Sequence, residues 1–317
     1  MDCRCRGCRR PLTLGLQPDH DAGFALLRVE ELDILRHPSR VAIHPTAVID
    51  TGARLDSTVE VGPYAVIDAG VQLGANCRVG PHVHLTGCTT AGARNVFGTG
   101  CVIGGPPQDI RFDGSPTRLR MGDDNVFREH VTVHCANRMD EDTRLGSGNL
   151  LMAHAHIGHN ACVGDRVIIA NGAQLGGHVI LGDRAFISAN CLIHQFVRVG
   201  TLALMQGGAA ISKDLPPYCI AWGDNSICGL NTIGLRRAGM SAPARLELRR
   251  LYRAVFRSQR GLKNALSTID SLVSTDAGRV FVDFLRSSRR GVVTHRPRGP
   301  IAIDSSESRP DDDGGDT

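Results

Sequence analysis

Apolar side chains recur at every sixth position along two long stretches of the chain. The first stretch runs from Ile43 to Ile103 and the second from Leu145 to Ile211, and each sixth residue in both is apolar. The position that follows is often glycine. The fourth position after each apolar residue is usually small, as at Ala47, Ala53, Ala65, Cys77, Ala155, Ala161, Ala173 and Ala185. A period of six matches neither an amphipathic helix nor an alternating strand.

This period is typical of a parallel β-helix. Six residues form one short strand and one turn, and three such faces complete a coil of 18 residues. The large aliphatic side chain points into the prism at each face, the small side chain shares the narrow interior, and glycine supplies permissive turn dihedrals. Residues 43–215 would form about ten coils at this spacing.

Two segments interrupt the repeat. Gly104–Arg120 and Cys135–Arg144 lack the six-residue pattern, and the second contains Asp140, Glu141 and Asp142 in a row. We predict that both segments are loops extruded from the prism. Loops on a rigid scaffold are favoured places for binding groups, so both are candidates for part of a functional site.

The spacing changes to a helical one near Ser241. Leu248, Leu251 and Val255 would share one face of an amphipathic helix. The opposite face is basic, with Arg245, Arg249, Arg250, Arg253, Arg257, Arg260 and Lys263. The predicted organisation is a partly disordered N-terminal extension with a short helix near Phe24–Leu35 (1–40), a β-helix with two loops (41–240), a helical domain (241–290) and a disordered tail (291–317).

Composition narrows the classes of function. The chain has 36 Lys and Arg against 32 Asp and Glu, a net charge of +4, so charge alone does not indicate nucleic-acid binding. No apolar run reaches the roughly 18 residues of a membrane helix, and the start of the chain lacks the order of a secretory signal. We therefore expect a cytoplasmic protein with no transmembrane segment. Cys3, Cys5 and Cys8 cluster near the start without a fourth metal ligand, so no metal site is predicted.

Three histidines fall in nearly the same phase of the coil. Counting from His159, positions 177 and 195 lie one and two coils later, and His178 and His194 are each within one residue of them. These rings are predicted to line one edge beside an extruded loop, with His156 three residues away. The alternative is a set of hydrogen-bonded turn histidines or a packed interface.

A histidine in a cleft suits acid–base chemistry. Imidazole has an ordinary pKa near 6.5 and can accept a proton at neutral pH. It could act as general base toward a sugar hydroxyl during acyl transfer, and Gly176-Gly177 would let a ligand approach the backbone. The sequence has no Gly-x-Ser-x-Gly motif, so a serine hydrolase is not supported.

Several motifs together resemble one enzyme family. They are Ile43-His-Pro-Thr-Ala, Pro107-Gln-Asp-Ile-Arg-Phe-Asp-Gly-Ser-Pro-Thr-Arg, Asn149-Leu-Leu-Met-Ala-His-Ala-His-Ile-Gly-His, Gly176-Gly-His-Val, Ile193-His-Gln-Phe, Asp214-Leu-Pro-Pro-Tyr and Gly234-Leu-Arg-Arg. From Ile43 to Arg286 the chain resembles the UDP-N-acetylglucosamine O-acyltransferase family of lipid A biosynthesis. Hexapeptide repeats occur in many acyltransferases, whereas the loop and histidine motifs are much more specific.

The resemblance implies a mainly β fold, a left-handed parallel β-helix of hexapeptide repeats with a C-terminal α-helical domain. It implies a homotrimer with active sites between neighbouring subunits. The implied reaction moves an R-3-hydroxyacyl chain from acyl carrier protein to the 3-hydroxyl of UDP-N-acetylglucosamine, as the first step of lipid A biosynthesis, with no cofactor or metal.

The resemblance also implies roles for individual residues. His159 matches the general base, and Gly177 matches the oxyanion donor. The positions around the sugar are Gln108, Asp109, His156 and His178. The positions in the nucleotide region are His194, Gln195, Asn231, Arg236 and Arg237. Gly207 matches the position that limits acyl length, and glycine there predicts a long chain.

Three positions depart from the family pattern. The aspartate that often follows the catalytic histidine is Asn160 here, which can orient an imidazole but stabilises imidazolium less. A lysine two positions after the loop aspartate is Arg111, which keeps the charge but not the shape. A glutamate near the uridine is replaced by Ile233. These departures leave open a lower activity or a paralogue with another substrate.

Further alternatives concern the partners and the chemistry. The basic helix face is predicted to dock acyl carrier protein, although a solvated helix face is often charged as well. A related hexapeptide acyltransferase could use a sugar amine or acetyl-coenzyme A. A zinc enzyme resembling the β-helical carbonic anhydrases is another alternative, because His154 and His159 are five residues apart, although Arg118 and Asp123 occupy the third-ligand region. The last alternative is that the protein is a scaffold without catalytic activity.

Overall fold

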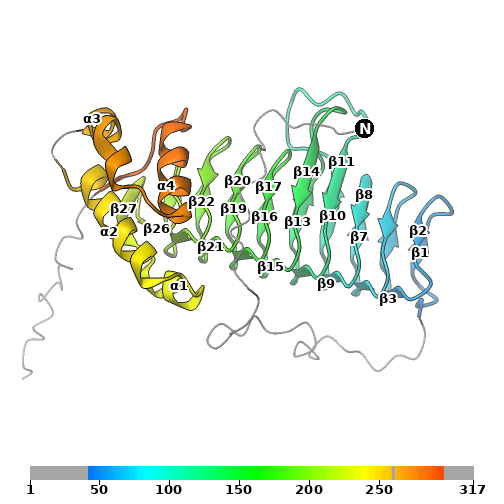
Figure 1. The fold of residues 1–317 in the computed structure, drawn as a ribbon. Helices are drawn as coiled ribbons and strands as arrows, with labels where there is room; N and C mark the ends of the chain where they lie inside the picture. Colours follow the sequence, from blue (N-terminus) through cyan, green and yellow to red (C-terminus); the bar gives the residue numbers. More distant parts are fainter. Residues whose placement is uncertain (1–41, 259–260, 296–317) are drawn as a thin grey trace, which may run out of the picture.

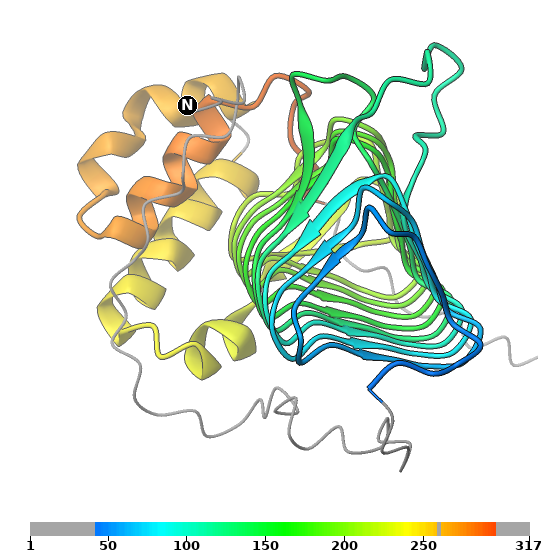
Figure 2. The same cartoon turned by 90° about the vertical axis from the view of Figure 1, so that its right-hand side faces the viewer.

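The computed structural model describes residues 42–258 and 261–295. Three sheets form the sides of a triangular prism, which Figure 2 shows end-on. Helices pack on the outside of the prism at its C-terminal end (Figure 1). The predicted N-terminal extension with its cysteine cluster and short helix, and the predicted tail beyond residue 295, lie outside the described residues.

The chain visits the three sheets in turn, once per coil. The first sheet contains β1 (Val48–Ile49), β4 (Val66–Ile67), β7 (His84–Leu85), β10 (Val102–Gly105), β13 (Thr132–His134), β16 (His156–Ile157), β19 (Gln174–Leu175), β22 (Leu192–Ile193) and β25 (Ala210–Ile211). The second contains β2 (Arg54–Leu55), β5 (Gln72–Leu73), β8 (Cys88–Ala91), β11 (Arg118–Met121), β14 (Asp142–Leu145), β17 (Cys162–Val163), β20 (Ile180–Leu181) and β23 (Arg198–Val199). The third contains β3 (Glu60–Val61), β6 (Arg78–Val79), β9 (Val96–Phe97), β12 (Val126–Phe127), β15 (Leu150–Leu151), β18 (Ile168–Ile169), β21 (Phe186–Ile187), β24 (Leu204–Met205), β26 (Cys219–Trp222), β27 (Ser226–Leu230) and β28 (Thr294–His295).

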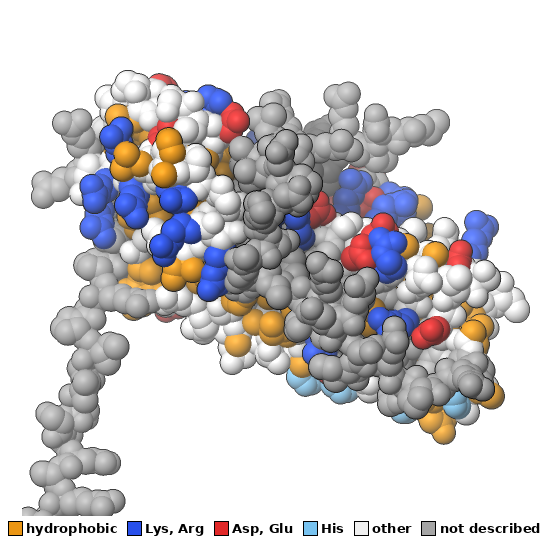
Figure 3. Space-filling view, turned by 60° about the horizontal axis from the view of Figure 1, so that its bottom comes forward, with side chains coloured by type: hydrophobic (Ala, Val, Ile, Leu, Met, Phe, Trp, Pro, Cys, Tyr) orange, Lys and Arg blue, Asp and Glu red, His pale blue; other side chains and the backbone are white. Residues whose placement is uncertain are grey.

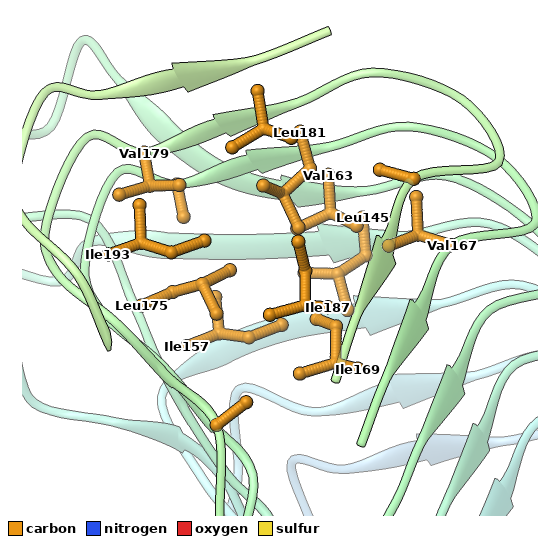
Figure 4. Packing of buried hydrophobic residues seen from close by; sticks show 14 of the residues in the cluster. Leu145, Ile157, Val163, Val167, Ile169, Leu175, Val179, Leu181, Ile187 and Ile193 are labelled. Carbon is orange, nitrogen blue, oxygen red and sulfur yellow. The ribbon is translucent and has the colours of Figure 1, made fainter. Parts of the chain in front are cut away.

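The periodic apolar residues form the interior of the prism. Ile157 pairs with Leu175, and Leu175 pairs with Ile193, in parallel register one coil apart. All three side chains are buried and point into the shared core (Figure 4). Truncating a fully buried leucine of this kind to alanine costs about 3 kcal/mol of stability. The predicted left-handed parallel β-helix is therefore confirmed.

The number of coils is smaller than the spacing predicts. The first sheet has nine strands and the second has eight, against about ten predicted coils. The difference arises because the two inserted loops use residues that the arithmetic assigned to coils. The small interior column is as predicted, since Cys77, Cys101 and Cys191 are buried free thiols.

Both loops leave the prism at one corner, where the chain passes from the first sheet to the second (Figure 2). We call this the loop corner; it comprises the loops 106–117 and 135–141 and the turns 158–161, 176–179 and 194–197. The loops are shorter than the predicted breaks, because the flanking strands are longer than two residues. β11 pairs with β14 over four residues, and Asp142 of β14 accepts hydrogen bonds from Arg118 and Arg120 of β11.

The C-terminal region differs from the prediction at both ends. Helices α1 (Thr232–Arg237), α2 (Ala242–Phe256), α3 (Gly261–Thr268) and α4 (Asp276–Arg286), with a 3-10 turn at Ile269–Leu272, follow an antiparallel β26–β27 pair. Helix α1 thus lies inside the segment predicted to be β-helix. The tail was predicted from residue 291, yet Val293 is fully buried and β28 pairs with β27.

Helix α2 begins as the sequence predicts. The Ser241 hydroxyl caps it by accepting a hydrogen bond from the Ala244 N–H, and Leu248, Leu251 and Val255 are buried. No helix within residues 42–258 and 261–295 has both the length and the apolar character that a membrane span requires.

Candidate active site

A cavity of about 740 Å³ lies beside the loop corner. Its walls come from the turn after β16, from β19 and β22, and from the end of β25. Of the residues predicted from the sequence, it is lined by Gln108, His156, His159, Gly177, His194 and Gln195. Residues that are distant in the chain but separated by whole coils therefore meet at one hollow.

The two ring nitrogens of His159 have different surroundings. Its Nδ1 lies 2.7 Å from Oδ1 of Asn160, and its Nε2 faces Gly177. A Cβ atom at residue 177 would lie only 2.6 Å from Nε2, so this position requires glycine. Among the described residues, the Gly177 N–H has no hydrogen-bond acceptor. The site thus combines a ring nitrogen with a neighbouring backbone donor.

Asn160 is a buried turn residue with a positive φ of 59°. Asparagine adopts this left-handed conformation more readily than most residues. Its backbone N–H donates to the Thr143 hydroxyl, and its Oδ1 also accepts from the Asn137 N–H. Its side chain is therefore fixed where it can orient the His159 ring.

The other predicted histidines surround His159 in two groups. The His178 ring meets His159 edge to face with centroids 5.2 Å apart, and its opposite side stacks on Phe196 at 4.5 Å. His194 lines the cavity instead of continuing this stack, because Phe196 is the residue one coil after His178. The predicted edge of three histidines is thus two histidines and a phenylalanine, with His194 exposed beside them.

His156 and His134 form the second group. Nδ1 of His156 lies 2.8 Å from the Thr132 hydroxyl, and its ring meets His134 at 5.0 Å. Burial, together with a smaller effect of His156 and His159, lowers the pKa of His134 to about 4. Burial also lowers the pKa values of His156 and His178, with a smaller contribution from His159. The neutral form of these three rings is therefore favoured at pH 7.

The first loop contributes a carboxylate and an amide. Gln108 is exposed and lines the cavity, whereas the Asp109 side chain is only 9% exposed. Asp109 accepts hydrogen bonds from the backbone and guanidinium of Arg111 and from Nδ2 of Asn137 at 2.8 Å. Hydrogen bonds from Arg111 hold the pKa of Asp109 well below its usual range. Asn137 therefore links both loops to the turn that contains Asn160.

Comparison with known proteins identifies the family. Residues 214–293 match domain 2 of the UDP-N-acetylglucosamine O-acyltransferase family, and residues 142–177 match the six-repeat bacterial transferase hexapeptide family. Over 255 residues the chain is 45% identical to the acyl-[acyl-carrier-protein]–UDP-N-acetylglucosamine O-acyltransferase of Anaeromyxobacter sp. (strain Fw109-5), covering 80% of this chain and 99% of that protein. The chain belongs to the UDP-N-acetylglucosamine O-acyltransferase family.

Other members of this acyltransferase family agree in sequence and in structure. The protein of the same name from Gloeothece citriformis is 43% identical over 265 residues, covering 83% of this chain and 95% of that protein. The solved UDP-N-acetylglucosamine acyltransferase from Bacteroides fragilis is 36% identical with a TM-score of 0.76, covering 79% of this chain and 99% of that one. The Francisella novicida acyltransferase is 32% identical with a TM-score of 0.77, covering 80% of this chain and 94% of that one.

Eight of the residues predicted from the sequence are not part of the cavity lining. Asp109, Arg111, Asn160 and His178 lie at the loop corner, whereas Gly207, Asn231, Arg236 and Arg237 lie elsewhere. Asn231 is buried and caps α1, accepting from the Gly234 N–H and donating to the Leu202 carbonyl. Arg236 and Arg237 are exposed in the last turn of α1. An added Cβ at Gly207 would meet only the Ala189 carbonyl at 3.5 Å, so the space beside it is open.

The geometry separates the two histidines of the zinc alternative. His154 lies in the turn before β16 and stacks on His130, whereas His159 lies in the turn after β16. These turns are at different corners of the prism, so the two rings do not converge within one chain. No group of three or more potential metal ligands is found in the described part of the chain.

Sequence reasoning missed three residues of this site. His134 lines the cavity, Asn137 bonds Asn160, and Glu141 accepts a hydrogen bond from Asn160 Nδ2. All three lie in or next to the second loop, where the 18-residue phase no longer applies. His134 could have been found from Val133, the preceding residue. Val133 pairs with Ile103 and so continues the column of interior apolar residues after the first loop.

Proposed function

We propose that this chain transfers an R-3-hydroxyacyl group from acyl carrier protein to the 3-hydroxyl of UDP-N-acetylglucosamine, the first step of lipid A biosynthesis. The observation that carries the proposal is the pairing of His159 with Gly177 beside the cavity. Family membership supports the donor and the acceptor, because the related proteins are named acyl-[acyl-carrier-protein]–UDP-N-acetylglucosamine O-acyltransferase. We place the reaction in the cytoplasm.

The proposed mechanism uses His159 as general base. Nε2 takes the proton of the sugar hydroxyl while the oxygen forms a bond to the thioester carbonyl carbon. The negative charge that develops on the carbonyl oxygen is stabilised by the Gly177 N–H. When the carbon–sulfur bond breaks, the imidazolium returns its proton to the leaving thiolate. Asn160 keeps the ring oriented throughout.

The substrate-binding roles follow the positions of the side chains. Neutral His156 and His178, with Gln108 and Asp109, would bind the sugar hydroxyls and the acetamido group. His194 and Gln195, exposed at the other end of the cavity, suit the nucleotide. Arg111 holds Asp109 in place. The open space at Gly207 suits a long acyl chain, because glycine adds no side chain to block it.

We propose a homotrimer in which sites form between subunits. Large apolar side chains near the loop corner are exposed, namely Ile110, Met139, Leu192 and Phe196. A neighbouring copy would cover them and could bring Asn231, Arg236 and Arg237 of its helix α1 toward the nucleotide. Analytical ultracentrifugation tests this proposal, since the chain mass is 34.0 kDa and a trimer has three times that mass.

We propose that acyl carrier protein docks on helix α2. Arg249, Arg250, Arg253 and Arg257 are exposed there, and Figure 3 shows basic side chains gathered over the helical end. Acidic partners are steered toward such a surface. Arg249→Glu with Arg253→Glu should raise KM for the carrier about tenfold, with kcat retained. Arg54→Glu, exposed at the far end of the prism, is the matched control. Unchanged, salt-insensitive carrier use would reject docking.

The direct test of the function is a transfer assay with purified protein. Hydroxyacyl carrier protein and UDP-N-acetylglucosamine should give an O-acylated product, and His159→Ala should nearly abolish it while folding is retained. Parallel reactions with a nucleotide amino sugar and with acetyl-coenzyme A separate the related acyltransferases. Faster transfer to the amine would replace the proposed acceptor, and no transfer with any pair would favour a non-catalytic scaffold.

A further inference from the structure

Glu141, in the loop between β13 and β14, contacts the side chain that holds His159. Its Oε2 accepts a hydrogen bond from Asn160 Nδ2 at 2.5 Å. Oδ1 of the same amide lies 2.7 Å from His159 Nδ1. The three side chains therefore form a continuous series from a carboxylate through a buried amide to the imidazole.

The orientation of the Asn160 amide is fixed by a third partner. The backbone N–H of Asn137 donates to Asn160 Oδ1 at 3.0 Å, and only the amide oxygen can accept it. Nδ2 is therefore the atom that faces Glu141, and Oδ1 has to accept from the Nδ1–H of His159. This arrangement selects the tautomer in which Nε2 carries a free lone pair on the side of Gly177.

The charge around His159 gives Glu141 a second role. Asn160 is neutral and cannot offset the positive charge that the ring gains with a proton. The other ionisable groups that act on this histidine cluster are His134, His156, His178, Arg138 and Asp109. The histidines and the arginine bring no negative charge, and Asp109 is bonded to Arg111. Among the described residues, Glu141 is the carboxylate joined to His159 by a single intervening side chain.

We propose that Glu141 is a positioning residue for acyl transfer. It supplies, through Asn160, the negative charge that an aspartate directly beside the base would supply. This inference rests on the proposed function, in which His159 is the base. Polarisation through a hydrogen-bonded amide is weaker than direct contact, so its contribution is a fraction of that of a direct pair.

The same geometry accounts for the amide at position 160. An aspartate there would place its second oxygen against Glu141 Oε2, and two carboxylates at hydrogen-bond distance do not both ionise. Asn160→Asp alone therefore does not raise kcat. Adding Glu141→Gln removes the repulsion, because the glutamine amide donates to the new carboxylate. The double variant is expected to work at or above the wild-type rate.

The test is a double-mutant cycle of Glu141→Gln and Asn160→Asp, with kcat and KM measured across pH. Glu141→Gln keeps an acceptor for Asn160 but removes the charge. We expect kcat to fall about tenfold, KM to change less than about threefold, and the acid limb of the profile to move to lower pH. Asp140→Asn removes the same charge from the neighbouring exposed position and should change none of these values.

A second readout does not require turnover. Nitrogen-15 NMR titration of the His159 ring should show a lower midpoint in Glu141→Gln than in the full-length wild-type protein. This measurement decides the role of Glu141 even if the wild-type protein transfers no acyl chain, which would reject the proposed function alone.

Two results would overturn the inference. The first is a Glu141→Gln variant with wild-type kcat, pH profile and ring titration. The second is a double variant no faster than Asn160→Asp. Because Glu141 Oε2 is also 4.0 Å from His178 Nδ1, an effect transmitted through His178 would persist in the double variant and would give this second result.

Discussion

Two corners of the prism carry pairs of histidine rings in contact, yet the cavity lies at only one of them. The corner between the third and first sheets has turns at 62–65, 80–83, 128–131 and 152–155, and we call it the plain corner. There His130 and His154 stack with centroids 5.2 Å apart, and both are exposed. At the loop corner, His159 and His178 are equally close but half-buried.

The backbone does not account for this difference. His130, His154, Asn160 and His178 all adopt positive φ between 57° and 60° at their turns. What distinguishes the loop corner is the layer of side chains that the inserted loops add, with Asn137 and Glu141 bonding Asn160. A repeating scaffold places rings at regular intervals, and the insertion fixes the orientation of one of them, His159.

The largest expected effect contrasts one histidine from each corner. His159→Ala removes the proposed base and should lower kcat about 10³-fold, within the usual range for general-base catalysis. His154→Ala should leave kcat within about threefold of wild type, because its ring lies away from the cavity. Steady-state transfer rates measure both. Equal losses in the two variants would mean that the corners are not functionally distinct.

The next effect concerns the glycine beside the base. Gly177→Ala would bring a methyl group within 2.6 Å of His159 Nε2 and displace the ring or the backbone donor. We expect a loss of about 10²-fold in kcat, comparable to losing an oxyanion donor. Gly229→Ala is the matched control, because no atom lies within 4 Å of its added carbon. A Gly177→Ala variant with wild-type kcat would contradict the proposed role of Gly177 as the oxyanion donor.

The smallest effect is a pH dependence of stability. The pKa of His134 is lowered to about 4 from an ordinary 6.5, so the unfolded chain binds a proton that the folded chain does not. Stability is therefore full above about pH 6.5 and falls as the pH drops toward 4, by about 1.4 kcal/mol at pH 5.5 from this residue. His156 and His178 shift in the same direction.

Urea unfolding at pH 7.5 and 5.5 measures that loss. His134→Gln should remove about 1.4 kcal/mol of the difference between the two pH values. His154→Gln, at the exposed ring of the plain corner, should leave the difference as in the wild type. A His134→Gln protein with the full wild-type difference would show that the buried ring is not its source.

The sequence predicted the regular part of the molecule far better than the inserted part. The apolar column from Leu145 to Ile211 determined the register, because each face of each coil needs one large interior side chain. His159 and Gly177 could be placed side by side for the same reason, being 18 residues apart. Phase alone did not separate His194 from Phe196, since a difference of two residues changes which ring continues the stack.

The contacts of the second loop could not be predicted in this way. An insertion has no period, so nothing in the spacing brings Glu141 to Asn160 or Asn137 to Asp109. The C-terminal end was misjudged for a related reason. After Pro216 and Pro217 the chain reverses into an antiparallel pair, and Val292 and Val293 return to cover it although they follow a basic segment.

The pairing across the loops has a consequence for how such a protein can change. Leu119 pairs with Thr89, and Thr143 pairs with Leu119, although inserted residues separate each pair by more than one coil length. Extra chain is thus accommodated outside the prism without altering what stacks above or below. Lengthening a loop at a corner would therefore leave the packing of the interior unchanged. The residues around the cavity could then vary without loss of the β-helix.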